Sequence, residues 1–202
     1  MRKRKFRIFI CIIMLLATLS GCFADLSGAD TKTTDDLSFY RVLSGEAEGV
    51  DMMPVFGTTE FDIPCPYDLP LLEELEPCKD VRFNYTAKRE SLFQSHAYIL
   101  IVSYDKEQYE DQEAALSAKY TFCTDDSEGF SDGTMSGHTY ETDDFIFQAV
   151  EGGEYPKEMF LLGLSDTRQE VAVIYFYDQD LDYIDVPLGK FLDNETGWNE
   201  IV

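Results

Sequence analysis

The sequence predicts an α+β fold, a single domain with a mainly antiparallel sheet and a few helices packed on it. Segments with the patterning of strands are joined by short polar turns, which favours antiparallel neighbours over parallel ones. One longer segment, residues 105–119, has the patterning of a helix instead. The chain has 202 residues, enough for one ordinary domain that follows a leader and a tether.

The first two strands are predicted in the middle of the chain. Apolar and polar residues alternate from Val81 to Lys88, as they do in a strand with one buried face. The segment Ala97–Tyr104 is almost continuously apolar, which suits a central strand. The polar residues between these segments indicate an antiparallel hairpin.

A helix is predicted after this hairpin, from Asp105 as its N-cap to about Lys119. Gln108 lies three residues after the cap, in the position of a capping box. One stripe of the helix holds Tyr109, Gln112, Leu116 and Tyr120. The acidic residues Glu107, Glu110, Asp111 and Glu113 lie off this stripe and are expected to face water, so the stripe is expected to face the core.

Further strands are predicted in the last third of the chain. Phe145–Val150 is the first of them, and Met159–Leu164 and Val171–Tyr177 form a hairpin across six polar residues. Both faces of Val171–Tyr177 are apolar, which predicts a central strand covered on both sides. Short helices are predicted over Leu69–Leu75 and Pro187–Leu192.

The first 22 residues differ from the rest of the chain. Five basic residues between positions 2 and 7 precede an apolar run of about a dozen residues, from Ile8 to Leu19. A basic start, a short apolar run and small residues at its end are the layout of a secretory signal peptide. A membrane-spanning helix needs roughly 20 apolar residues, so this run is too short to span.

The segment Leu19-Ser20-Gly21-Cys22 resembles the lipobox of bacterial lipoproteins. The resemblance implies signal cleavage between Gly21 and Cys22 and attachment of a diacylglycerol lipid to Cys22. The mature protein would then be anchored to the cell membrane on its extracytoplasmic face, or to the outer membrane of a two-membrane bacterium. Each buried CH₂ of an acyl chain contributes about 0.8 kcal/mol, so two or more chains hold a soluble domain at the surface.

Three parts follow from these observations: a signal peptide at 1–21, a lipidated Cys with a flexible tether at 22–36, and an extracytoplasmic α+β domain at 37–202. Residues 23–36 are mostly small and polar and show no periodicity, as in a tether. Cleavage leaves 11 basic against 39 acidic residues and moves the formal charge from −23 to −28. Such a chain is repelled by phosphate groups, which excludes an electrostatic binder of nucleic acid.

The cysteines after Cys22 are Cys65, Cys78 and Cys123. A disulfide between Cys65 and Cys78 would close a short loop in an exported protein, and free thiols are the alternative. The sequence does not choose between them. For nucleophilic catalysis, the one Cys–His pair to consider is Cys123 with His138.

Calcium is the one cofactor for which the sequence offers a ligand set. Asp178, Asp180 and Asp182 occupy alternate positions directly after a predicted strand, as carboxylates do in calcium loops. The positions where an EF-hand needs Gly and Glu hold Tyr183 and Gly189, so this is not an EF-hand. The alternative is a solvated acidic loop.

Aromatic residues late in the chain allow two interpretations. Tyr175, Tyr177, Tyr183 and Trp198 could form a platform that binds a glycan or a peptide. Tyrosines at alternate positions of a strand are also ordinary sheet packing.

The leading functional hypothesis is a lipid-anchored lipoprotein whose domain is a non-catalytic binding or cell-envelope accessory domain, not an enzyme. Its partners would be the membrane, through Cys22, and an envelope protein or ligand that the sequence does not identify. One alternative is a cell-envelope hydrolase that uses carboxylates or Cys123 with His138. Another is a structural or assembly subunit of an envelope complex, whose partner covers an acidic face.

Overall fold

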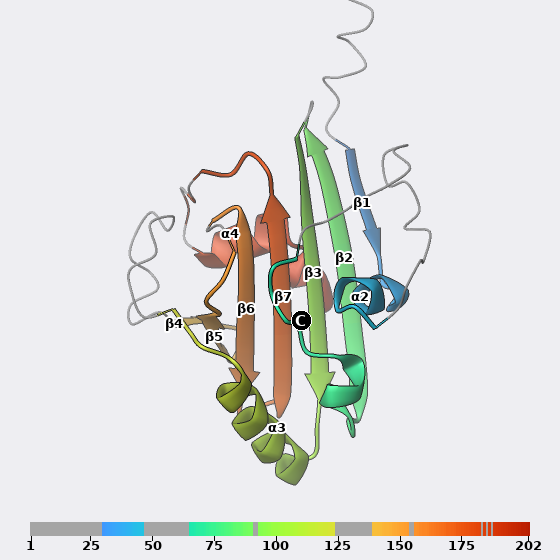
Figure 1. Ribbon diagram of the computed structural model, residues 1–202, viewed down its shortest axis with the longest axis vertical. Coiled ribbons are helices and arrows are strands. Elements are labelled where there is room, and N and C mark those ends of the chain that lie inside the picture. Colours follow the sequence, from blue (N-terminus) through green and yellow to red (C-terminus); the bar gives the residue numbers. More distant parts are fainter. Residues whose placement is uncertain are drawn as a thin grey trace, which may run out of the picture.

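A computed structural model describes residues 30–46, 65–90, 93–123, 139–153, 156–182, 184, 186 and 188–202. These residues form one antiparallel sheet with the strand order β1-β2-β3-β7-β6-β5-β4 (Figure 1). The strands are β1 Asp30–Thr34, β2 Asp80–Glu90, β3 Phe93–Ser103, β4 Thr139–Thr142, β5 Phe145–Ala149, β6 Glu158–Ser165 and β7 Glu170–Asp178. The helices are α2 Ser38–Leu43, the 3₁₀ helix η1 Leu72–Leu75, α3 Lys106–Lys119, α4 Leu188–Glu195 and α5 Trp198–Ile201. The predicted α+β class is confirmed.

The centre of the sheet is the pairing of β3 with β7. The two strands run antiparallel from Ser95 opposite Asp178 to Ser103 opposite Glu170. Strand β2 lies on the outer side of β3, and β6 lies on the outer side of β7. The predicted hairpins and the central position of Val171–Tyr177 are therefore confirmed.

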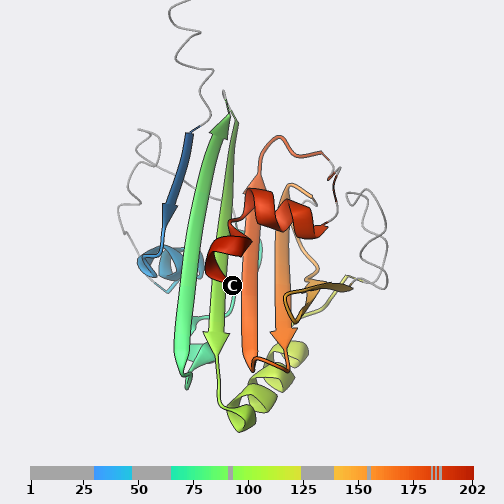
Figure 2. The same ribbon diagram turned by 180° about the vertical axis from the view of Figure 1, so that it is seen from behind.

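Helices cover both faces of the sheet, which makes three layers (Figures 1 and 2). On one face, Tyr40 of α2, Leu75 of η1 and Leu116 of α3 belong to the same buried cluster. On the other face, Leu192 of α4 and Trp198 of α5 belong to a second cluster. The strands between them are apolar on both sides because neither face is open to water.

Helix α3 begins where the sequence predicts. The backbone N–H of Asp105 donates to Oε1 of Gln108 at 3.3 Å, which is the reciprocal half of the predicted capping box. Tyr109 and Leu116 are buried, so the predicted apolar stripe does face the core.

The helix predicted over Leu69–Leu75 is shorter than expected. Only the 3₁₀ turn η1 forms, because Leu71 directly before it has extended backbone, with φ of −68° and ψ of 150°. The Tyr40 hydroxyl donates to the Pro70 carbonyl oxygen at 2.6 Å and holds the backbone before the turn in place. Pro77 disfavours helical backbone at Glu76, so the turn ends at Leu75.

The predicted tether reaches too far into the chain. Residues 30–34, placed in the tether, instead form the edge strand β1, with Asp30 opposite Arg89 and Thr34 opposite Tyr85. The folded part described by the structure therefore begins before residue 37. An edge strand with an exposed face needs no apolar alternation, and its β-branched threonines favour extended backbone. Residues 22–29 lie outside the described residues.

One close contact in the sheet gives a stability prediction. A Cβ built on Gly163 of β6 would lie 2.4 Å from the ring of Phe147 on β5, and Phe147 is fully buried. We expect Gly163→Ala to lower the free energy of unfolding of the mature chain by about 1–3 kcal/mol, measured by urea denaturation.

The matched control is the same substitution in a Phe147→Leu background. Phe147→Leu alone also destabilises, but it removes the ring that the new methyl group meets. Gly163→Ala should therefore lower the free energy of unfolding clearly less in that background. An equal loss of unfolding free energy in both backgrounds would show that contact with the Phe147 ring is not the reason why position 163 needs glycine.

Candidate functional site

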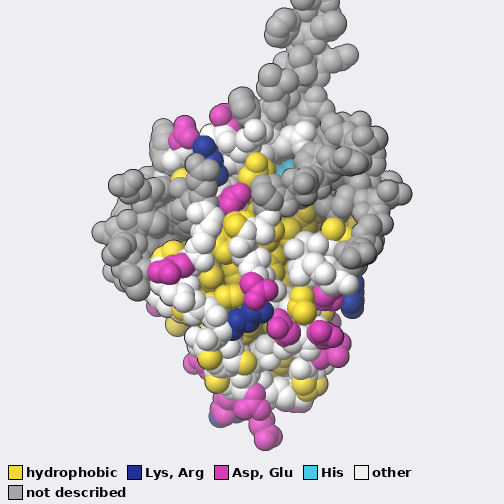
Figure 3. All heavy atoms as spheres, in the orientation of Figure 1, with side chains coloured by type: hydrophobic (Ala, Val, Ile, Leu, Met, Phe, Trp, Pro, Cys, Tyr) yellow, Lys and Arg dark blue, Asp and Glu magenta, His cyan; other side chains and the backbone are white. Residues whose placement is uncertain are grey.

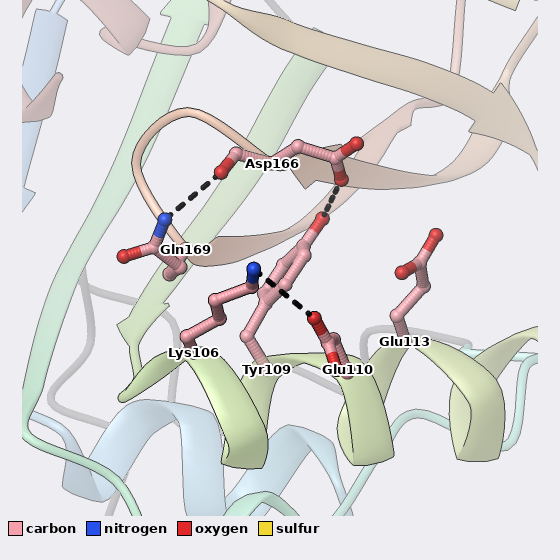
Figure 4. Close-up of a pocket in the computed structure, with 6 residues that line it drawn as sticks. All are labelled: Lys106, Tyr109, Glu110, Glu113, Asp166 and Gln169. Carbon is pink, nitrogen blue, oxygen red and sulfur yellow. Dashed lines mark hydrogen bonds and ion pairs between the residues drawn. The ribbon is translucent and has the colours of Figure 1, made fainter.

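A pocket of about 380 Å³ lies between the first half of α3 and the turn that joins β6 to β7 (Figure 4). Its lining residues are Lys106, Tyr109, Glu110, Glu113, Asp166 and Gln169. The helix supplies four of them and the turn supplies two. Three of the six carry a carboxylate.

Hydrogen bonds hold the floor of this pocket. The buried Tyr109 hydroxyl donates to Oδ1 of Asp166 at 2.9 Å, and the Gln169 side-chain amide donates to the Asp166 carbonyl oxygen at 3.0 Å. Burial raises the pKa of Tyr109, with further contributions from its bond to Asp166 and from the charges of Asp166 and Glu113. The hydroxyl therefore stays protonated and remains a donor, which fixes the position of the Asp166 carboxylate.

A second hollow of about 700 Å³ continues from the first and shares Glu113 and Asp166 with it. It extends over the β4–β5 hairpin. Its lining residues are Glu113, Thr139, Glu141, Thr142, Asp143, Asp144, Phe145, Ile146, Gln148, Leu164, Asp166 and Thr167. Five of these residues are acidic, and none is Lys or Arg. The two hollows together are called the acidic groove below.

The β4–β5 turn presents two of the carboxylates in a defined position. Asp143 and Asp144 both have left-handed backbone, with φ of 48° and 67°, as a two-residue hairpin turn requires. The Trp198 indole N–H donates to Oδ2 of Asp143 at 2.8 Å. Nε of Arg168 lies 3.8 Å from Oδ2 of Asp144, and its guanidinium carbon lies 5.6 Å from the centre of the Phe145 ring. Trp198 and Arg168 thus hold the two carboxylates of the turn in place.

Ile146 adds an apolar element to the groove. Its side chain is 50% exposed, and it is the one large hydrophobic residue that is exposed among the described residues. Acidic side chains are also frequent over the α3 end of the sheet face in Figure 3. The groove therefore combines negative charge with an accessible hydrophobic contact.

The residues predicted to bind calcium do not converge. The Asp180 backbone N–H donates to Oδ1 of Asp178 at 2.9 Å, and Asp182 lies 3.8 Å from Nζ of Lys157. Across the described part of the chain, no three His, Cys, Asp or Glu side chains are grouped closely enough to hold a metal ion. The geometry fits the alternative of a solvated acidic loop.

Within the described residues, Cys65, Cys78 and Cys123 are free thiols, so Cys65 and Cys78 are not joined. Burial raises the pKa of Cys65 to about 11, and it also raises the pKa of Cys78 and Cys123. A raised pKa keeps a thiol protonated near neutral pH, whereas nucleophilic attack needs the thiolate. His138, the proposed base for Cys123, lies outside the described residues.

The aromatic platform considered from the sequence is wrong. Tyr175 and Trp198 are fully buried and belong to clusters on opposite faces of the sheet. Tyr177 is half-buried, and Tyr183 lies outside the described residues. Tyr175 and Trp198 are packing residues, because both are covered by the layers on their faces of the sheet.

The acidic groove was not foreseen from the sequence. Asp143, Asp144 and Asp166 lie in polar segments of a chain with 39 acidic residues, and Glu113 lies on a helix with several other acidic residues, so acidity alone does not distinguish them. The residues come from three separate segments, and the one local signal is the Asp-Asp turn itself.

Gly21 and Cys22 also lie outside the described residues, so the lipobox remains a prediction. None of the helices that the structure describes has the length and apolar character needed to cross a membrane. Comparison with known proteins finds no family model, no curated protein and no solved structure that matches the chain.

The buried His96 predicts a dependence of stability on pH. Its Nδ1 lies 2.7 Å from the Tyr85 hydroxyl, and burial lowers its pKa to about 4 from a usual value of 6.5. The unfolded chain binds the proton more readily, so the contribution is complete above about pH 6.5 and is lost as the pH falls toward 4. The loss amounts to at most about 3 kcal/mol.

We expect the difference in unfolding free energy between wild type and His96→Gln to shrink as the pH falls from 7 to about 4.5. Urea denaturation at several pH values measures it. Titration of carboxylates affects both proteins, so it cancels in the difference. A difference that stays constant with pH would mean that His96 is not held neutral in the folded state.

Proposed function

We propose that this chain is a bacterial lipoprotein, anchored on the extracytoplasmic side through Cys22, whose folded domain binds a partner and performs no catalysis. The lipobox Leu19-Ser20-Gly21-Cys22 and the signal-like leader before it support the anchor. Binding is favoured over nucleophilic catalysis by the described cysteines, whose raised pKa values keep them protonated.

The acidic groove is the surface that the partner would occupy, and this is the observation that carries the proposal. Its larger hollow, about 700 Å³, is within the usual size range of ligand sites. Five carboxylates line it without a basic residue, and Ile146 is exposed beside them. A segment that carries Lys or Arg next to an apolar side chain would complement both features.

This proposal unites two of the hypotheses drawn from the sequence. A binding or accessory domain and an assembly subunit with a covered acidic face both require an acidic surface that a partner can occupy. Long-range attraction adds to the local fit, because the mature chain carries a formal charge of −28 and draws cationic partners toward it. A cell-envelope hydrolase has less support, since Asp166 and Asp143 are held by Tyr109 and Trp198.

The anchor is tested by metabolic labelling with a fatty acid in a bacterium that processes lipoproteins. We expect label in the wild-type chain and none in Cys22→Ala, because the thiol of residue 22 is the proposed attachment point. Cys65→Ala serves as the matched control and should be labelled like wild type. Equal labelling of wild type and Cys22→Ala would overturn the anchor.

The groove is tested with a short peptide of alternating Lys and Leu, compared with a Glu and Leu peptide of the same length. We expect the mature chain to bind the Lys peptide more tightly, with an affinity that falls as salt is added. Glu113→Gln combined with Glu141→Gln should weaken binding on the order of fivefold, since each exposed ion pair contributes up to about 1 kcal/mol. Ile146→Asn should weaken it as well. Calorimetry or fluorescence anisotropy measures the affinities.

The control removes the same charge elsewhere. Glu73 and Asp193 are exposed and do not line the groove, so Glu73→Gln combined with Asp193→Asn should change the affinity much less. If the two double variants weaken binding equally, the peptide responds to net charge alone and the groove is not its site.

A further inference from the structure

The two ends of the sheet lie at different distances from Asp30, the first residue of β1. Strand β1 starts at Asp30, opposite Arg89, so the chain enters the fold at the end where β2 turns into β3. At the other end, Asp80 pairs with Ser103 and Ser103 pairs with Glu170, directly after the β6–β7 turn. The smaller hollow of the acidic groove is built on that turn and on α3, and Figures 1 and 2 show both at the end remote from the start of β1. The larger hollow extends from there over the β4–β5 hairpin at the edge of the sheet.

The number of residues between residue 22 and β1 limits how the domain can be oriented relative to the membrane. Residue 22 is eight residues from Asp30, and eight residues span at most about 29 Å even when fully extended. The sheet from the level of Arg89 to the level of Asp80 is about 30 Å long, at about 3.3 Å per residue. Helix α3 projects past that level and adds part of a helix diameter of about 10 Å (Figure 1).

An inverted domain would need more chain than is present. If the α3 end touched the bilayer, Asp30 would stand more than about 30 Å above the surface. The eight residues from an anchored residue 22 to Asp30 reach at most about 29 Å. The thioether and glycerol of the lipid add a few ångströms of reach, and the projection of α3 past the sheet offsets them. A domain lying flat is disfavoured by charge, because the acidic surface would be pressed against anionic lipid.

We infer that the anchored domain stands with its β2–β3 turn toward the membrane and presents the acidic groove on the side away from it. The partner is then a basic and apolar segment of an envelope protein that reaches the groove from the aqueous side, not the lipid that holds the anchor. This inference rests on the proposed lipid anchor and adds an orientation and a direction of approach to it.

Energy transfer to the membrane surface tests the orientation. A clickable unnatural amino acid replaces either Thr31 at the start of β1 or Thr167 in the β6–β7 turn, both exposed threonines, and carries the donor fluorophore. The lipidated protein is placed in vesicles that contain a headgroup-labelled acceptor lipid. We expect transfer from position 31 to exceed transfer from position 167 severalfold. Equal transfer, or stronger transfer from position 167, overturns the inference.

A longer tether provides the matched control. Sixteen Gly and Ser residues inserted between Ala29 and Asp30 raise the maximum reach to about 86 Å, enough for the domain to invert. Transfer from position 167 should then rise toward the value at position 31. An unchanged contrast would show that something other than tether length sets the orientation, which also overturns the inference.

A separate flotation assay measures whether the protein is anchored to the vesicles. If the native chain does not float with lipid, the proposed function fails. The mature chain with a clickable residue at position 22, coupled to a synthetic lipid, then tests the orientation alone. The same contrast between positions 31 and 167 is expected there, and its absence overturns the orientation whatever the natural anchor is.

Discussion

The structure depends on the antiparallel pairing of β3 with β7, two strands whose side chains are apolar on both faces. Ile99 and Ile174 point to one face, and Leu100 and Val173 point to the other; all four are buried. Burying a side chain of this size contributes about 1.5–3 kcal/mol, so the pair is stable only if both faces are covered. That requirement accounts for α2, η1 and α3 on one side and α4 and α5 on the other.

Hydrogen bonds to Glu170 stabilise the β3–β7 pair at the end nearest the groove. Arg82 on β2 donates to Oε1 of Glu170 on β7 at 2.7 Å, and the Ser103 hydroxyl donates to the same oxygen at 2.8 Å. The second guanidinium nitrogen of Arg82 donates to the Ile201 carbonyl oxygen at 2.7 Å and ties down the C-terminal helix. Glu170 is mostly buried, and these donors offset part of the cost of removing its charge from water; Nη1 of Arg168 lies 3.9 Å from its other oxygen, Oε2. Three strands and α5 are thereby held in register.

The groove proposed to bind a partner lies at the periphery of the sheet, outside its central pair of strands. The groove is formed by an edge hairpin, a turn and one helix, and none of these contributes a strand to the central pair. Turns on a rigid scaffold can hold charged side chains at fixed positions, as Tyr109 does for Asp166 and Trp198 does for Asp143. The remote end of the sheet is also the end that the proposed anchor at Cys22 would keep away from lipid.

The sequence by itself determined the features whose signals are local. These are the strands with apolar or alternating patterns and the capped helix α3, each of which is specified by consecutive residues. Edge strand β1 escaped prediction because backbone pairing with β2, not side-chain burial, holds it.

Only the tertiary structure decided the groove, because Glu113, Asp143 and Asp166 belong to segments that meet only after the sheet has formed. The same holds for Trp198, which reads as a surface aromatic in sequence and is buried against Phe145 and Phe147 at ring-centre distances of 5.4 and 5.2 Å. Spacing along a chain predicts which face a side chain takes within one element, but not which other element will cover that face.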